Sequence, residues 1–176
     1  MNRNYNALIL KSVKITAGAI LAILFASCLN LKYSATAGII TILSIQNTKK
    51  ETIQTALARG EAFCCALLVS FLCYNFFGYT TAAFGIYLLV FTTLCLTMKW
   101  SSAIAMDSVL ITHFLAEKTM NIPMIANEIS LFLIGAGIGV LLNLSLRPKE
   151  NEWKDKMAEA DESIRSIIKR MAENRI

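Results

Sequence analysis

The chain has 176 residues, of which 56% are hydrophobic and 16% charged, and its formal net charge is +5. This length allows one membrane domain of about six helices with a small soluble appendage, and it excludes a second globular domain. The positive balance fits anchoring to anionic lipid. Nucleic acid is not an expected partner, because no basic stripe lies on a soluble element.

Six apolar stretches predict an all-α, polytopic membrane protein of about six transmembrane helices plus a C-terminal cytoplasmic amphipathic helix. We expect a six-helix domain over residues 1–148 and a cytoplasmic helix over 149–176, which could be the start of a longer soluble portion. Two stretches are short for a bilayer, which needs about 20 residues, so they borrow flanking residues, cross a thinned region or are partly re-entrant. The stretches are Ile15–Leu31, Tyr33–Ile45, Ala62–Phe77, Thr80–Met98, Ser101–Ala116 and Ile125–Leu146.

The first stretch follows a basic start but has no small-residue cleavage site, so we expect an uncleaved first helix. Small residues recur on it at helical spacing, at Gly18, Ala22 and Ala26, and again in the sixth stretch at Gly135 and Gly139. Such stripes let helix backbones approach closely in lipid. Packing within one subunit is the favoured interpretation, and dimerisation through Gly135 and Gly139 is the alternative.

The second stretch is rich in hydroxyl groups and ends in a polar cluster, which predicts a helix that lines a solute pathway. Its hydroxyls can satisfy backbone carbonyls or touch a solute, and the lysines that follow could attract an anion from the cytoplasm. For the lysines alone, anchoring to lipid headgroups is the favoured alternative. The pathway candidates are Thr36, Thr41, Ser44, Gln46, Asn47, Thr48, Lys49, Lys50 and Arg59.

The fifth stretch holds the candidates for proton coupling, namely Asp107, His113 and Glu117. A charge at membrane depth costs at least about 2.5 to 3.5 kcal/mol, so Asp107 is not expected to face lipid. His113 and Glu117 are four residues apart and share a helix face, so they are the expected pair and could relay protons near neutral pH. The favoured alternative is a hydrogen-bonded histidine at the interface, without a relay role.

Three further charges, Arg59, Glu61 and Glu128, fall near the ends of apolar stretches. Long side chains at helix ends reach the headgroups at low cost, so the simple expectation is that these three snorkel.

The last segment alternates apolar residues with dense charges and predicts an amphipathic helix. Its apolar stripe could lie on the membrane surface or form a short coiled coil with another helix. The stripe consists of Trp153, Met157, Ala160, Ile164, Ile167 or Ile168, and Met171.

Orientation follows from the distribution of Lys and Arg, which are enriched in cytoplasmic loops. The basic connections are the N-terminal segment, the region from Lys49 to Arg59, the turn at Lys99 and the segment after Leu146. The turns at Lys32, at Gly78–Thr80 and at Glu117–Pro123 carry few positive residues. With an even number of spans, both termini are predicted to be cytoplasmic.

No cofactor or metal is expected, and an enzyme is the least favoured class. The five cysteines lie in apolar stretches without a C-x-x-C pair or neighbouring ligands, which is typical of packing. The single histidine leaves no nucleophile and base pair. There is no G-x-x-x-x-G-K-[ST] loop, so energy for transport would come from an ion gradient or a partner.

The residues of the second stretch and its loop resemble the membrane part of the bacterial aromatic acid exporter family, which is related to the fusaric acid resistance proteins. The resemblance rests on the run Thr36–Ile40, on Ile45–Lys50 and Arg59, and on Asn127-Glu128 and Gly135 through Pro148. It implies an inner-membrane six-helix module that expels carboxylated aromatic compounds, often as a homo-oligomer or with a second module.

The resulting hypothesis is an exporter in which an anionic, partly apolar solute enters near Lys49, Lys50 and Arg59 and passes along the second helix. Proton or ion flow would drive it, with Asp107 as the coupling carboxylate and His113 in the outer half. The alternative is a membrane module without transport activity that mediates oligomerisation or recruits a partner.

Overall fold

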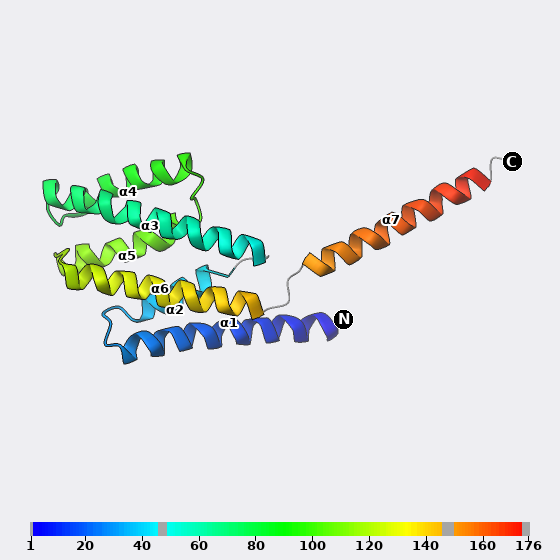
Figure 1. Ribbon diagram of the computed structural model, residues 1–176, viewed down its shortest axis with the longest axis horizontal. Coiled ribbons are helices and arrows are strands. Elements are labelled where there is room, and N and C mark those ends of the chain that lie inside the picture. The colour runs from blue at the N-terminus through cyan, green and yellow to red at the C-terminus, as the bar shows by residue number, and fades with distance from the viewer. Residues whose placement is uncertain (1, 46–48, 146–149, 174–176) are drawn as a thin grey trace.

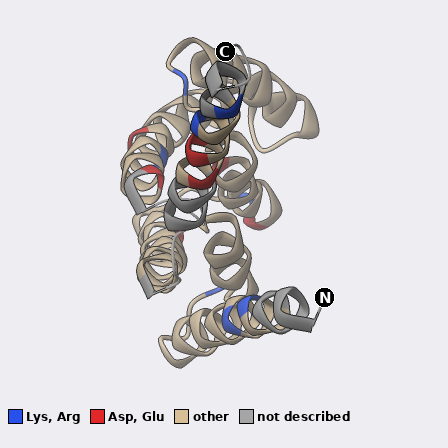
Figure 2. Ribbon diagram, turned by 90° about the vertical axis from the view of Figure 1, so that its right-hand side faces the viewer, with Lys and Arg blue, Asp and Glu red and all other residues tan. Residues whose placement is uncertain are grey.

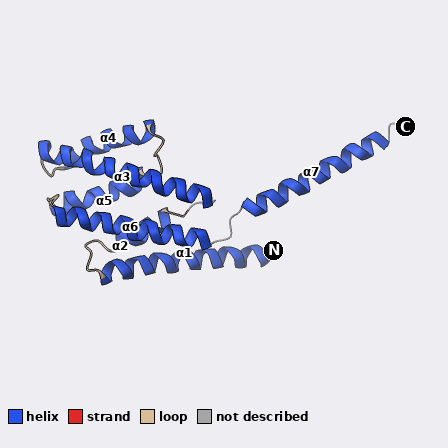
Figure 3. Cartoon of the chain, in the orientation of Figure 1, coloured by secondary structure: helices blue, strands red, loops and turns tan. Residues whose placement is uncertain are grey.

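The computed structural model describes residues 2–45, 49–145 and 150–173, and within them the chain forms α-helices and no strand (Figure 3). The expected all-α fold is therefore confirmed. The helices are α1 (Asn2–Cys28), α2 (Ala35–Leu43), α3 (Lys49–Phe77), α4 (Thr81–Thr97), α5 (Ile104–Glu117), α6 (Ile122–Ser145) and α7 (Glu150–Glu173).

Helices α1 to α6 correspond to the six apolar stretches, with different ends. α3 begins at Lys49, well before its apolar stretch, whereas α2 has only 9 residues and α5 only 14. Three segments are long and apolar enough to cross a bilayer, Ile9–Cys28, Glu51–Phe77 and Ile122–Leu144, and α4 is a shorter apolar helix. The number of six transmembrane helices stays a prediction.

Local signals explain where several helices begin and end. The Thr80 hydroxyl accepts a hydrogen bond from the Ala83 amide at the start of α4, and the Asn121 side chain accepts one from the Met124 amide at the start of α6. Asn30 and Lys99 have positive φ angles of 54° and 62° just after α1 and α4. A left-handed residue at that place reverses the chain and ends the helix.

The helices α1 to α6 run alternately in opposite directions, so their connections gather at two ends of a bundle (Figure 1). The turns at Lys32, Gly78 and Lys118 lie at one end, and the starts of α1, α3 and α5 lie at the other. The last residues of α6 return to the end where α1 begins. This arrangement agrees with the alternation of basic and less basic connections in the sequence.

The surface of the bundle is largely apolar. Leu68, Leu89 and Leu133 are 67%, 73% and 62% exposed, and they belong to three different helices. Charged residues are instead concentrated on α7, as Figure 2 shows for the described residues. An apolar surface of this kind fits contact with lipid tails.

Helices α1, α2 and α6 pack through the small residues. A Cβ atom at Gly38 would lie 2.7 Å from Ile23, and one at Gly135 would lie 2.6 Å from the Ile40 Cβ. A Cβ atom at Gly139 would likewise lie 2.5 Å from the Ser44 Cβ, and Gly18 lies against the Leu142 side chain. Ala22 is fully buried. These glycines therefore mediate contacts between helices of one chain.

Helices α3, α4 and α5 pack instead through larger side chains, including the fully buried Tyr87, Phe91 and Phe114. α3 also contacts α6, and α2 contacts α5, so the two groups of helices share an interface. Among the described residues, α7 makes no contact with the bundle, from which it extends (Figure 1). Several buried polar residues lie at this interface, including Arg59, His113 and Glu128.

Candidate functional site

The first polar site is a buried pair between α5 and α6. His113 Nδ1 lies 2.7 Å from Glu128 Oε2, and Glu128 has no exposed surface. An ionised carboxylate only accepts hydrogen bonds, so with an ionised Glu128 the donor in this contact is Nδ1–H. Thr36 Oγ1 on α2 lies 3.3 Å from Nε2, and a hydroxyl can donate to a neutral ring or accept from a protonated one. The Thr36 hydroxyl can therefore remain hydrogen-bonded to His113 whether or not Nε2 carries a proton.

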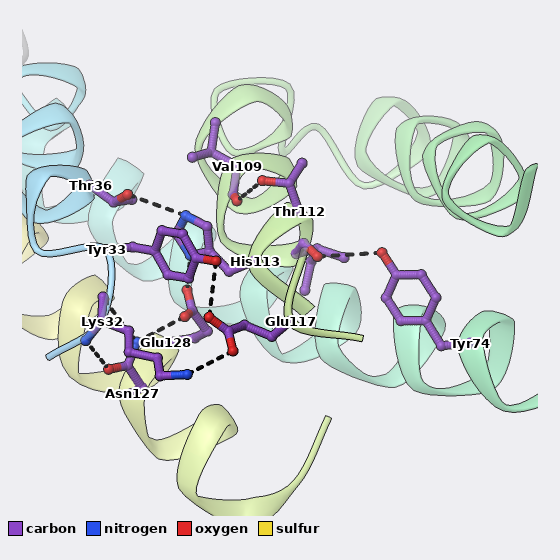
Figure 4. A network of polar contacts seen from close by, with 11 residues as sticks. Lys32, Tyr33, Thr36, Tyr74, Val109, Thr112, His113, Glu117, Asn127 and Glu128 are labelled. Atoms are coloured by element: carbon purple, nitrogen blue, oxygen red, sulfur yellow. Dashed lines mark hydrogen bonds and ion pairs between the residues drawn. The ribbon is translucent and has the colours of Figure 1, made fainter. Parts of the chain in front are cut away.

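Around this pair, polar contacts form a closed network that we call the His113 network: Lys32, Tyr33, Thr36, His113, Glu117, Asn127 and Glu128 (Figure 4). The Tyr33 ring stacks on His113 with centroids 4.0 Å apart. The Tyr33 hydroxyl donates to Glu117, which also binds Lys32 Nζ at 2.7 Å. The network joins the turn between α1 and α2 to both α5 and α6.

Asn127 closes the network from α6. Its side-chain oxygen accepts from the Lys32 amide at 2.8 Å, and its Nδ2 donates to the Lys32 carbonyl and to Glu128. This contact fixes the turn that carries Tyr33. Tyr33 itself has a positive φ of 58°, which is unusual for a bulky residue and is maintained by these surrounding contacts.

The exposed part of the His113 network is the Lys32 and Glu117 pair. Its hydrogen bond raises the pKa of Lys32 and lowers the pKa of Glu117, so both groups are charged at neutral pH. The side chains are 58% and 28% exposed, and water and salt therefore screen the pair.

We expect Lys32→Met and Glu117→Gln each to lower the thermal midpoint only slightly in low salt, because the lost ion pair is exposed. The difference from the parent chain should disappear in high salt, where the pair is already screened. Thermal unfolding in detergent at two salt concentrations measures this. A loss that stays the same in high salt would contradict the screened-pair interpretation.

A second polar site lies toward the other end of the bundle. Arg59 of α3, which is 5% exposed, donates through Nε to the Ser102 carbonyl at 3.2 Å and through Nη1 to Ser44 Oγ at 3.4 Å. The Asn143 side chain of α6 donates to Thr52 of α3 nearby along the same helices. These contacts hold α2, α3, α6 and the start of α5 together at this end.

Asp107 on α5 is fully buried, and neither carboxylate oxygen has a hydrogen-bond partner within the described residues. Asp107 and Arg59 form no ion pair with each other. The Tyr87 and Ser108 hydroxyls are also buried without a partner among these residues. Unpaired buried oxygens are expensive, which makes this carboxyl group a place for a proton or another small partner.

The predicted pathway residues of α2 are buried at its contacts with the other helices. Thr36 contacts His113, and Ser44 accepts from Arg59. The Thr41 hydroxyl donates to the Ala37 and Gly135 carbonyls, so it satisfies backbone groups. Gln46, Asn47 and Thr48, and the side chains of Lys49 and Lys50, lie outside the described residues.

Two sequence-based expectations are wrong. His113 pairs with Glu128 instead of Glu117, because α6 brings a buried carboxylate closer than the same helix does. Glu128 and Arg59 do not snorkel, since both are buried inside the bundle, whereas Glu61 is exposed. Glu128 is only the fourth residue of its apolar stretch, so hydropathy alone does not distinguish it from a carboxylate at a helix end. The roles of Tyr33, Lys32 and Asn127 depend on a turn that the sequence pattern does not specify.

The fold and the two sites define a helical membrane protein with ionisable groups buried at an interface between helices. The chain belongs to the family described as aromatic acid exporter family member 1, whose match covers residues 7–146. This is a family of membrane transporters and not a class of enzymes.

A protein of Bacillus subtilis (strain 168), described as uncharacterized protein YqjA, is 36% identical over 134 residues. The match covers 76% of this chain and 42% of that relative, so the chain spans less than half of the relative's length. No solved structure matches the chain.

Proposed function

We propose that the chain exports carboxylated aromatic compounds from the bacterial cytoplasm and that a proton or other ion gradient drives the transport. Membership of the exporter family supports this function. In the proposed orientation, the protein crosses the inner membrane several times and both termini are cytoplasmic. The basic connections then lie at the inner end, and the His113 network lies at the outer end.

The proposed pathway follows the interface between the group α1, α2 and α6 and the group α3, α4 and α5. Arg59 is the buried cation nearest the inner end of this interface, where it is shared between Ser44 and Ser102. A guanidinium recognises a carboxylate through paired hydrogen bonds. Arg59 therefore suits the first step, with Lys49 and Lys50 attracting the anion before it.

The coupling proposal is supported by the carboxyl group of Asp107, which is buried and has no hydrogen-bond partner among the described residues. An unpaired carboxylate is costly in a low-dielectric interior. Binding or release of a proton at Asp107 would therefore change the free energy of the conformation that buries it. His113, held between Glu128 and Thr36, serves the outer half of the path. Glu117 contributes by holding Lys32 and Tyr33 at the outer turn.

The test uses inside-out membrane vesicles with an acidic lumen and a labelled hydroxybenzoate outside. We expect proton-driven accumulation by the parent chain, and we expect Asp107→Asn to reduce it to the level of empty membranes, because asparagine cannot carry the proton. A protonophore should abolish accumulation in the same way. Asp161→Asn, at an exposed position of α7, is the matched control and should transport normally.

Accumulation that persists in Asp107→Asn but is lost with the protonophore would move the coupling group elsewhere in the chain. Absence of accumulation by the parent chain, with the protein present in the membrane, would contradict autonomous export.

The alternative function is a membrane module that assembles with a second copy or another module. One observation favours it: α7 makes no contact with the bundle among the described residues, and it exposes Met157, Ile164 and Ile167 along one side. These positions follow the spacing of an amphipathic helix. Crosslinking through single cysteines on this side of α7 in membranes would detect a homo-oligomer, and absence of a crosslink would weaken this alternative.

A further inference from the structure

In each set of three consecutive helices, α1–α3 and α4–α6, the middle helix is the shortest. α1 ends at Cys28 and α2 begins at Ala35, while α4 ends at Thr97 and α5 begins at Ile104. Both pairs of positions are 69 residues apart (97 minus 28, and 104 minus 35). The turns also agree, because the left-handed residues Asn30 and Lys99 have the same separation.

Hydrogen bonds in the two turns correspond as well. The Leu31 amide donates to the Ala26 carbonyl, and the Trp100 amide donates to the Cys95 carbonyl. Each residue of the second bond is again 69 positions after its counterpart. α4 runs opposite to α1 in Figure 1, so the second unit is inverted relative to the first. An odd number of helices per unit requires this inversion.

The contacts between helices also correspond when α1, α2 and α3 are matched with α4, α5 and α6. α1 packs on α6 and α4 packs on α3, while α2 packs on α6 and α5 packs on α3. The third helix of each unit therefore completes the other unit. The polar contacts correspond too: Arg59 binds Ser44 and Glu128 binds His113, each across 15 residues.

Equivalent residues of two inverted units can touch each other only at the axis that relates them. Phe63 and Phe132 are 69 residues apart, and their rings stack with centroids 5.0 Å apart and planes at 4°. Both are buried, in the same apolar cluster as Met106 and Leu110. Phe63 is the middle residue of α3, which spans Lys49–Phe77, so the axis crosses the bundle near half its depth.

One helical turn from the aromatic pair lie groups of opposite charge. Arg59 precedes Phe63 by four residues on α3, and Glu128 precedes Phe132 by four residues on α6. Because the two helices are antiparallel, Arg59 lies toward one end of the bundle and Glu128 toward the other. Arg59 has five N–H donors, and its two hydrogen bonds within the described residues leave further donors for a solute.

We propose that α1–α3 and α4–α6 are inverted repeats and that the solute site lies on their shared axis, between Phe63 and Phe132. The solute ring inserts between the two phenyl rings, and its carboxylate binds Arg59. In transporters built from inverted repeats, substrate sites lie at the repeat interface near the midplane, close to short helices in corresponding positions, as α2 and α5 are here. In this structure the two rings are stacked, so the site is closed, and it opens when the group α1, α2 and α6 moves away from the group α3, α4 and α5.

This site rests on the proposed function for the class of solute, but its test needs no ion gradient. Binding of labelled benzoate to the purified chain in lipid nanodiscs is measured at equilibrium, with labelled hexanoate as the carboxylate that lacks a ring. We expect saturable binding of benzoate and weaker binding of hexanoate. Phe63→Leu and Phe132→Leu should each raise the Kd for benzoate about three- to tenfold through loss of stacking.

Arg59→Gln should raise the Kd for both carboxylates by about tenfold or more, because a charged hydrogen bond is lost. Phe71→Leu, at a lipid-exposed position of the same helix, and Arg165→Gln, on α7, are the matched controls and should bind like the parent chain. Circular dichroism and gel filtration of each variant confirm that the folded fraction is the same before the binding constants are compared.

Absence of saturable benzoate binding by the parent chain would overturn the site. So would binding by Phe63→Leu and Phe132→Leu that equals binding by Phe71→Leu, and so would an effect at only one of the two phenylalanines. Intact binding without vesicle transport would instead overturn only the exporter function. If the parent chain transports hydroxybenzoate but Phe63→Leu and Phe132→Leu bind benzoate like the parent chain, the exporter function stands and only the axial site is overturned.

Discussion

Replacing Glu128 with alanine is expected to lower the free energy of unfolding by roughly 3 to 5 kcal/mol. The substitution removes the carboxylate that His113 Nδ1 contacts at 2.7 Å and leaves a buried imidazole without its partner. It also removes one acceptor of Asn127, which fixes the Lys32 turn. Denaturant-induced unfolding in mixed detergent micelles, followed by circular dichroism, measures the loss.

The control for this prediction is Glu61→Ala, because Glu61 is exposed on α3 and should change stability by less than about 0.5 kcal/mol. The double variant with His113→Ala should be clearly more stable than the sum of the single changes predicts, since the two residues share one interaction. Equal stability of Glu128→Ala and Glu61→Ala would show that the buried pair does not form.

The second large effect is expected for Gly135→Ala, which should destabilise the bundle by about 1 to 3 kcal/mol through overpacking. The new Cβ would lie 2.6 Å from the Ile40 Cβ and 2.7 Å from the Ala37 carbonyl oxygen. Backbone atoms of α2 cannot rotate away as a flexible side chain can. The two helices must therefore separate, and the Thr41 hydrogen bond to the Gly135 carbonyl is strained with them.

Gly137→Ala is the matched control on the same helix, because a Cβ there meets nothing within 4 Å. Alanine should stabilise that position by up to about 1 kcal/mol, since glycine is the poorer helix former. The two substitutions are thus expected to have opposite signs in the same unfolding assay. A stabilising effect of Gly135→Ala would contradict the close contact between α2 and α6.

Hydropathy was sufficient to place α1 to α6, because each apolar stretch has to satisfy its backbone groups within a helix when it is removed from water. The ends were less well predicted. The helix α3 continues to Lys49 through polar residues that helices tolerate, and α2 begins only at Ala35, after the turn fixed by Asn127. Neither boundary has a signal in hydropathy alone.

The candidate sites were predicted in part. A charge within an apolar run indicates a buried polar site, which is why Asp107 and His113 were identified. Their partners could not be found by the same means, because spacing along one helix only identifies neighbours on that helix. Glu128 is 15 residues from His113, and Thr36 is 77 residues away.

The sequence by itself determined the all-helical membrane class and the residue types that are costly to bury, because these follow from the transfer of each side chain out of water. The tertiary structure alone decided which of these residues meet. The repeat could be seen only there, since Phe63 and Phe132 are alike but Arg59 and Glu128 carry opposite charges. Helix packing depends on shape and burial, which corresponding positions of the two units preserve while their residue types differ.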